Sequence, residues 1–424
     1  MLQRLFFLLL LMPTIAIAQT ADPLTTRAED VQKMLNGSIP PDDLFHDSFF
    51  AQVPLQQVKD VVGHFAPVMG PIQNVALLKR GGKSAGTFAF TGSNGMKMEV
   101  DLAIDTAPPH KIIGLLLKPP TATGGATTEG LDALLSQLKK LPGTVSFMLM
   151  KLPEQKVIAS VNSEQLMAIG STFKLYILGE LMSRVAEGEA TWETVIATDS
   201  AICGGGGRLA SWPHGAPVTL HTLATLMISE SDNVATDHLL RYLGRERVEQ
   251  RVAAMGHRNP QRMIPLLATW EAFKLKSVGA RAQRKQLASP SESERRSALR
   301  GVETLAVEYE DGLGPMAIDT VEWFASASDL CRALDALRSM PDAHQTGRNI
   351  MGVNPGLMAD TTVWSYIGYK GGSEPGVLNL SFLLRAQSGE WYALSVGWNN
   401  PAAPLAEDQL LGLVQQILYT GPWR

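Results

Sequence analysis

Ser171 and Lys174 are two side chains that together could carry out nucleophilic chemistry. They lie three residues apart at the start of segment 175–185, whose pattern is helical, so the hydroxyl and the ammonium would share one helix face. A serine hydroxyl is a poor nucleophile without an adjacent base. A lysine can be that base only where burial and neighbouring charges lower its pKa from about 10.4. Because Ser-x-x-Lys recurs by chance in many helices, it needs support from other motifs.

Ser231, Asp232 and Asn233 form a second polar group, between two segments with helical patterns. A second hydroxyl could pass a proton to a leaving nitrogen, and the Asn233 amide could hold both Lys174 and a substrate carbonyl. An ordinary helix start is the alternative, because serine, aspartate and asparagine are all common N-cap residues.

Lys370, Gly371, Gly372 and Ser373 form a third group, on a predicted strand. Glycine lets a substrate backbone lie close to the strand, and the ammonium would attract a substrate carboxylate. The alternative is a strand that simply ends in a turn.

The order of the three groups resembles the Ser-x-x-Lys, Ser-Asp-Asn, Lys-Thr-Gly set of penicillin-recognising serine enzymes. Residues 129–424 resemble the class A β-lactamase family, and segment 218–237 is very similar to the helix that carries that family's second motif. Segments 322–326 and 370–376 resemble a divergent two-domain branch, which includes a β-lactamase-like protein of clavulanic acid biosynthesis.

The resemblance implies catalytic roles for three side chains. Ser171 would be the acylated nucleophile, Lys174 its base or proton relay, and Ser231 the proton donor to the leaving nitrogen. No cofactor and no metal are implied.

The resemblance also implies a substrate-binding group, made of Asn233, Lys370, Gly371, Gly372 and Ser373. Asn233 would position the catalytic lysine and a substrate amide, and Lys370 would attract the substrate carboxylate. The backbone N–H groups of Ser373 and of the nucleophile would form the oxyanion hole. Gly371 replaces the family's threonine and supplies no hydroxyl, so Ser373, on the same strand face, would substitute in part.

The base for deacylation is the larger departure from the family. Class A enzymes carry a Glu-x-x-Leu-Asn loop after the second motif, and this chain has no such string. The nearest acid is Glu271, and with Thr269 as the predicted N-cap it would lie in a first helical turn, where acids are common. We therefore expect a structural Glu271, which leaves Lys174 or another acid to activate water.

The chain is expected to divide at residues 119–128, an uncharged, turn-rich stretch that we interpret as a linker. Before it, residues 22–118 have a small α+β pattern that resembles steroid-isomerase-like (cystatin-like) domains. A substrate-positioning or dimerisation role is expected for this accessory domain. The predicted helices are 25–35 and 55–65, and the predicted strands are 74–79, 86–91, 97–104 and 111–117.

Residues 129–424 would form the serine hydrolase domain, in an α+β fold. Strand patterns at both of its ends imply one sheet assembled from both termini, and the resemblance implies an antiparallel five-stranded sheet flanked by helices beside an all-helical lobe. The predicted strands are 144–152, 364–369, 376–384 and 391–397, and the predicted terminal helices are 131–141 and 405–418. The polar segment 274–300 is expected to be a solvated helix pair, with a binding lid as the alternative.

Residues 1–18 are typical of a secretory signal peptide: a basic residue, a short apolar run and a small-residue end. The run is too short to span a membrane, which takes about 20 apolar residues. The mature protein is therefore expected to be periplasmic or secreted, without a membrane anchor. Cys203 and Cys331 could pair in such a compartment, or both could be separate buried thiols.

The composition argues against several other classes of protein. A net charge of -4 gives no reason to expect a nucleic-acid partner. Two cysteines exclude a four-cysteine zinc site, and the eight histidines show no metal-binding spacing.

Three functions remain open. The first is hydrolysis of a β-lactam or related amide through a Ser171 acyl-enzyme. The second is cleavage of another acyl bond, in an ester or a D-Ala-D-Ala cell-wall peptide. The third is a penicillin-binding protein that is acylated without turnover. The partner is a small molecule in each case, and the oligomeric state stays open.

Overall fold

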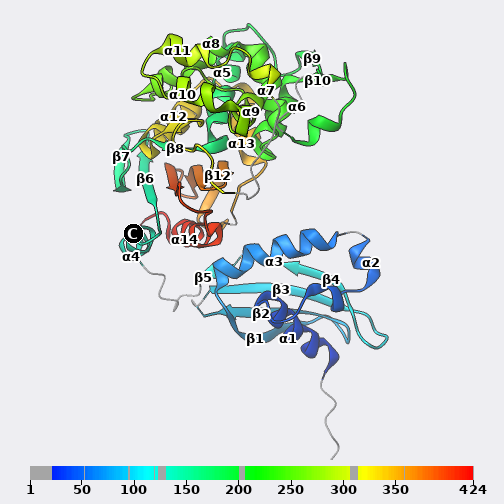
Figure 1. Ribbon diagram of the computed structural model, residues 1–424. Helices are drawn as coiled ribbons and strands as arrows, with labels where there is room; N and C mark the ends of the chain where they lie inside the picture. The colour runs from blue at the N-terminus through cyan, green and yellow to red at the C-terminus, as the bar shows by residue number, and fades with distance from the viewer. Residues whose placement is uncertain are drawn as a thin grey trace, which may run out of the picture. The chain divides into compact units, whose positions relative to one another are not determined.

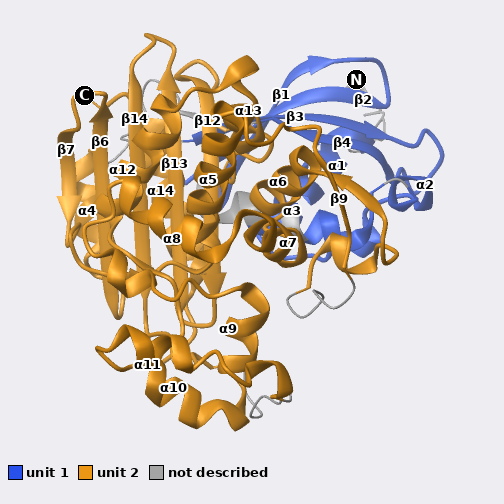
Figure 2. Cartoon of the chain, turned by 90° about the horizontal axis from the view of Figure 1, so that it is seen from above, with its two compact units in different colours: residues 1–118 blue, residues 119–424 orange. Residues whose placement is uncertain are grey.

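The computed structural model describes residues 22–51, 53–93, 96–118, 120–122, 130–199, 206–305, 314–357 and 359–423. The chain forms two compact units, residues 1–118 and 119–424 (Figure 2). The predicted signal peptide lies outside the described residues, as do Cys203 and most of the predicted linker.

The first unit contains an antiparallel sheet of order β1-β2-β3-β4 together with helices (Figure 1). β3 shows the alternation that its sequence predicts, with every second side chain buried. Helix α1 is held at its start by Asp22, whose carboxylate accepts from the Thr25 N–H. The elements are α1 Pro23–Leu35, α2 Asp47–Phe50, α3 Leu55–Met69, β1 Ile72–Arg80, β2 Ala85–Gly92, β3 Met96–Ile104 and β4 Ile112–Leu117; β5 Thr121–Ala122 follows.

The second unit is built on a five-stranded antiparallel sheet of order β12-β13-β14-β6-β7. Strands from both ends of the unit meet where β14 pairs with β6, so the prediction of one sheet from both termini is confirmed. β7 was not placed from the sequence, because this edge strand lacks a clear alternation. The strands are β6 Thr144–Leu152, β7 Lys156–Val161, β12 Trp364–Glu374, β13 Val377–Ala386 and β14 Trp391–Asn399.

Helices cover both faces of this sheet. α4 (Leu131–Leu138) and α14 (Glu407–Thr420) share one apolar cluster with the strands, and α12 (Ala327–Ser339) shares another on the opposite face. Further helices form the lobe beyond α12, as the fold prediction expected (Figure 2). They are α5 Lys174–Ala186, α6 Leu220–Ser229, α7 Asn233–Leu243, α8 Arg245–Ala254, α9 Thr269–Leu275, α10 Arg281–Leu287, α11 Glu292–Ser297 and α13 Thr346–Gly352.

Helix α5 is the central helix of this lobe, and its first nine residues are all buried. A helix that is apolar on every side belongs in a core. The charged exceptions are Glu180, which pairs with Arg184 and Arg251, and Lys174 at the first position, whose amine the fold therefore buries.

Segment 274–300 contains the helix pair α10 and α11, separated by a turn at Ser289 and Pro290. Neither helix has a fully buried residue, as a solvated pair predicts. Among the described residues, no helix has the length and apolar character needed to cross a membrane.

Candidate active site

Ser171 lies in a short 3-10 turn, Gly170–Phe173, between strand β8 (Met167–Ala168) and helix α5. β8 is held by pairing with β11 (Phe324–Ala325). Gly170 has a φ of +49°, a backbone conformation that glycine adopts without strain. The turn leaves the Ser171 side chain half-buried at the edge of the core.

Two contacts with the core hold the turn Gly170–Phe173 in place. The Phe173 ring stacks on Trp323 with centroids 3.9 Å apart and planes 2° from parallel. The Thr172 hydroxyl donates to Asn379 Oδ1 of strand β13 at 3.0 Å, and both residues are buried. These contacts hold the two residues directly after Ser171, so they restrict the backbone that carries its hydroxyl.

Lys174 is completely buried, and its Nζ is surrounded by acceptors from the second motif. It donates to Asn233 Oδ1 at 2.7 Å, to the Ser231 carbonyl at 2.7 Å and to Ser231 Oγ at 3.1 Å. Burial lowers the pKa of Lys174 to about 7, against the nearby carboxylates of Asp237 and Asp232, which raise it. A large share of this amine is therefore neutral near neutral pH, as a base must be.

The second motif joins helices α6 and α7 through a strained residue. Ser231 has a φ of +57°, which is rare outside glycine and is found at functional sites. Asp232 is the N-cap of α7, because its carboxylate accepts from the Ala235 N–H at 2.8 Å. The helix-start alternative is therefore confirmed by Asp232, and its two neighbours, Ser231 and Asn233, contact Lys174.

Lys370 of strand β12 also contacts the Ser231 hydroxyl. Its Nζ donates to Ser231 Oγ at 3.0 Å, and burial, followed by the charge of Lys174, holds its pKa well below the usual range. Ser231 Oγ thus accepts from two lysine side chains. Its own proton is then free to point toward a third group, such as a substrate nitrogen.

Gly372 brings strand β12 against the nucleophile turn. A Cβ atom on Gly372 would lie 2.2 Å from the Ile169 carbonyl oxygen and 2.5 Å from the Ser171 nitrogen. A Cβ atom on Gly170 would lie 3.1 Å from the Ser373 nitrogen. Gly372 is therefore required by the approach of the chain's own backbone, whereas the sequence suggested approach of a substrate. The two predicted oxyanion donors lie on facing segments.

Gly371 has a neighbour that sequence reasoning missed. A Cβ atom there would lie 2.0 Å from the Tyr369 Oη, because residues two apart on a strand share a face. The Tyr369 ring packs on Phe382, with centroids 4.9 Å apart. A phenol therefore fills the space beside the missing threonine side chain, and the Ser373 side chain is exposed nearby on the same strand.

Glu271 is buried and fully engaged. Its carboxylate pairs with Arg245 through two hydrogen bonds of 2.9 and 2.8 Å and accepts from the Ala268 N–H at 2.7 Å. The prediction of Thr269 as N-cap was wrong: α9 begins at Thr269, and Ala268 is the N-cap, because Thr269 is used elsewhere. This geometry agrees with a structural role for Glu271.

Asp237 is a second residue that sequence reasoning missed. It accepts from the Thr269 N–H at 2.7 Å, from the Thr269 hydroxyl at 2.6 Å and from the Trp270 N–H at 3.1 Å. Burial raises its pKa, although these hydrogen bonds and the charge of Lys174 act in the opposite direction. Its position one helical turn after Asn233 was the available signal.

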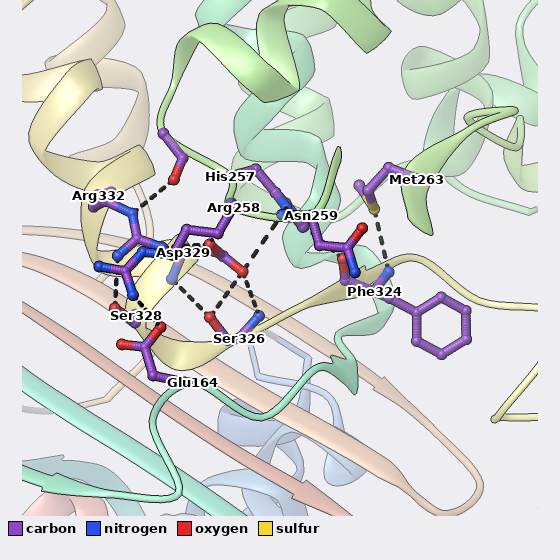
Figure 3. A network of polar contacts seen from close by, with 11 residues as sticks. Glu164, His257, Arg258, Asn259, Met263, Phe324, Ser326, Ser328, Asp329 and Arg332 are labelled. Atoms are coloured by element: carbon purple, nitrogen blue, oxygen red, sulfur yellow. Dashed lines mark hydrogen bonds and ion pairs between the residues drawn. The ribbon is translucent and has the colours of Figure 1, made fainter. Parts of the chain in front are cut away.

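A polar network behind β11 supports the start of the site (Figure 3). The Asp329 carboxylate accepts from the Ser326 N–H at 3.0 Å, from its hydroxyl at 2.7 Å and from the Arg258 N–H at 2.9 Å. His257 Nε2 donates to the Phe324 carbonyl at 2.8 Å, while its Nδ1 accepts from the Asn259 N–H at 3.0 Å. β11, which pairs with β8, is thereby tied to α12.

Within the described ranges, no three histidine, cysteine or acidic side chains lie close enough to hold a metal ion. Cys331 is a free, buried thiol. Burial raises its pKa well above the usual range of a thiol.

The second unit of the chain matches a known protein family. Residues 127–419 match the model of the beta-lactamase enzyme family. A comparison with curated proteins gives no match. Similar solved structures include a beta-lactamase from Sphaerobacter thermophilus DSM 20745, at 20% identity over 69% of this chain and 95% of that chain, with a TM-score of 0.49. PBP-A is 15% identical over 72% of this chain and 98% of its own, with a TM-score of 0.48.

Proposed function

Because the chain belongs to the beta-lactamase enzyme family, we propose that it is a serine hydrolase that cleaves a β-lactam or a related amide through an acyl-enzyme on Ser171. The observation that supports this most directly is the hydrogen-bonded set around Ser231, where the nitrogens of Lys174 and Lys370 lie 3.1 and 3.0 Å from one hydroxyl oxygen. A structural role alone gives no reason to bury two lysine side chains beside one serine, because burying an ionisable group is costly.

In the proposed reaction, neutral Lys174 takes the proton of the Ser171 hydroxyl as its oxygen attacks the substrate carbonyl carbon. A bond forms between Ser171 Oγ and that carbon, and the C–N bond then breaks. The Ser231 hydroxyl gives its proton to the leaving nitrogen and is reprotonated by Lys174. The N–H groups of Ser171 and Ser373 would stabilise the oxyanion, and losing one such donor typically lowers the rate about 10²–10³-fold.

The carboxylate of a substrate would fit beside strand β12, across the proposed site from Lys174. Lys370 brings positive charge there, the Ser373 hydroxyl is exposed, and Asn233 carries an amide beside Lys174. We therefore assign Asn233, Lys370, Gly371, Gly372 and Ser373 to substrate binding.

The rate of deacylation distinguishes a β-lactamase, which releases the acyl group, from a protein whose β-lactam acyl-enzyme persists. Because Arg245 engages both oxygens of Glu271, this acid is a poor candidate for activating water. Lys174 would have to do so, and we expect the acyl-enzyme to persist. That expectation favours a second candidate function, an esterase, a D-Ala-D-Ala peptidase or a penicillin-binding protein acylated without turnover.

Intact-protein mass spectrometry over time tests both functions, with benzylpenicillin and, separately, a chromogenic cephalosporin. We expect one adduct per chain, absent in Ser171→Ala and retained in the control Ser136→Ala, which removes an exposed hydroxyl on α4. An adduct that disappears as hydrolysed drug accumulates would indicate a β-lactamase, and a persistent one the alternative. Labelling of Ser171→Ala would contradict the assignment of the nucleophile.

We also propose that the protein acts outside the cytoplasm, on the basis of the signal-like residues 1–18. Cell fractionation with mass determination of the mature N-terminus tests this, and an intact N-terminus in the cytoplasmic fraction would contradict it.

A further inference from the structure

Lys276, Glu322 and the partly exposed Glu374 form an ionisable cluster drawn from three distant parts of the second unit. Lys276 follows helix α9, Glu322 precedes β11, and Glu374 is the last residue of β12. Lys276 Nζ lies 2.7 Å from Glu322 Oε1 and also pairs with Glu374 Oε1. The side chains of Lys276 and Glu322 are 9% and 1% exposed.

Glu322 connects this cluster to the turn that carries the proposed nucleophile. Its second oxygen, Oε2, accepts from the Gly170 N–H at 3.2 Å and from the Trp323 N–H at 3.2 Å. One carboxylate therefore holds the ammonium of Lys276 with one oxygen and the backbone directly before Ser171 with the other.

Glu374 connects the cluster to strand β12. It directly follows Ser373, whose N–H is the second proposed oxyanion donor. The two backbones lie in close contact here, since a Cβ atom on Gly170 would lie 3.1 Å from the Ser373 nitrogen. The chain of contacts from Gly170 through Glu322 and Lys276 to Glu374 thus bridges the two segments that carry the donors.

The charges in the cluster compensate one another. Burial, and then the adjacent charge of Glu322, raise the pKa of Glu374 to about 9. Burial lowers the pKa of Lys276, but the two carboxyl groups outweigh this effect and the net shift is upward. These shifts favour an arrangement in which the two carboxyl groups share one proton beside the Lys276 ammonium.

Buried ion pairs are weak evidence for stability, because desolvation opposes the attraction between the charges. Fixing a geometry is a better explanation where the pair joins two functional segments. We propose that Lys276, Glu322 and Glu374 are positioning residues that hold the N–H groups of Ser171 and Ser373 toward one point and so set the oxyanion hole. This inference rests on the proposed acyl-enzyme function.

Disconnecting the cluster should weaken acylation more than binding. Lys276→Met and Glu374→Ala each remove one link, so we expect acylation to slow about 10–100-fold, less than the roughly 10²–10³-fold of losing a whole oxyanion donor, because the N–H groups are displaced and not removed. The dissociation constant of the complex before acylation should change less than about threefold, because the donors act mainly on the transition state. Glu374→Gln should restore the rate, since glutamine resembles the protonated acid and keeps the contact with Lys276.

Isotope-edited infrared spectroscopy of the acyl-enzyme gives the decisive measurement, with benzylpenicillin carrying ¹³C at the lactam carbonyl. Hydrogen bonds from the oxyanion hole lower the stretching frequency of the acyl carbonyl. We expect a higher frequency in Lys276→Met and Glu374→Ala than in the wild type and Glu374→Gln. The control is Glu390→Gln, which breaks the exposed Lys151–Glu390 pair on the same sheet.

An unchanged carbonyl band and acylation rate in folded Lys276→Met and Glu374→Ala would overturn the proposal, as would an equal change in Glu390→Gln. If the wild type forms no acyl-enzyme, the proposed function fails, and amide hydrogen exchange still tests the cluster. The Gly170 amide should then exchange faster in Lys276→Met than in the wild type, and equal exchange would overturn the inference. Should Lys276→Met not fold, Glu374→Ala compared with Glu374→Gln carries the test.

Discussion

At the scale of a single residue, the lowered pKa of Lys174 predicts how the acylation rate depends on pH. Its pKa is lowered to about 7 by burial, and only the neutral amine can take a proton. The acylation rate should therefore rise about tenfold per pH unit below pH ~7 and level off above it. Measuring the burst of a chromogenic cephalosporin across pH tests this, with Lys174→Arg as an inactive reference. A rate that stays constant through neutral pH would exclude Lys174 as the base.

Gly371 gives a second prediction at this scale. In Gly371→Ala the new Cβ would collide with the Tyr369 hydroxyl, so we expect a loss of about 1–3 kcal/mol in unfolding free energy. Gly279→Ala is the matched control, because nothing lies within 4 Å of its Cβ position. Thermal unfolding compares the two, and equal stability of both variants would show that Tyr369 moves away freely.

At this scale, the sequence predicted which residues belong to the candidate site. It did not predict which residues from distant segments contact them. Ser171, Lys174, Ser231, Asn233 and Lys370 were selected from spacing, and the structure brings the last four of these to hydrogen-bonding distance of one another in a chain of contacts. The contact of Tyr369 with Gly371, and that of Glu322 with the nucleophile turn, depend on how distant segments cross. No local pattern encodes such crossings.

At the scale of elements, helix α9 gives a test of Glu271. Glu271→Gln removes the charge that faces Arg245 and should lower the unfolding free energy by about 1–3 kcal/mol. The lifetime of any acyl-enzyme should not change, because Arg245 and the Ala268 N–H engage both oxygens of the side chain. Mass spectrometry of adduct decay measures this, and a lifetime lengthened manyfold would instead identify Glu271 as the base for deacylation.

Helix α12 gives a second test at this scale, at its capping box (Figure 3). Ser326→Ala removes the hydroxyl that accepts from the Asp329 N–H at 3.0 Å, so we expect a loss of about 1–2 kcal/mol. Chemical denaturation measures the loss, and the control Ser339→Ala, at the exposed last residue of the helix, should be near neutral. Equal effects would mean that the cap contributes nothing specific.

Element types were predicted well, and element ends less well. Strand patterns at both ends of the unit predicted that residues 144–152 and 391–397 share one sheet, and the structure adds that they pair directly. The start of α9 could not be read, because Thr269 is a good N-cap residue by type yet bonds to Asp237 instead. Tertiary contacts thus override a local preference at one position while leaving the helix in place.

At the scale of the whole molecule, every residue of the candidate site belongs to the second unit. A chain that lacks residues 1–118 is therefore expected to be acylated at the rate of the full chain. Mass spectrometry with benzylpenicillin, after circular dichroism has verified folding, compares the two. A folded fragment with no adduct would show that the first unit contributes to the chemistry.

The pairing of β6 with β14 also affects when the second unit can fold during synthesis. Thr144 lies opposite Asn399, so a strand made early in the synthesis of the second unit waits for one made much later. Such distant pairings slow folding, because a long loop must close before its contacts form. Until then β6 is an open edge that can pair wrongly or be held by a chaperone. The proposed nucleophile is thus in place only after nearly all of the second unit has been synthesised, and a chain that stops before β14 would lack the complete site.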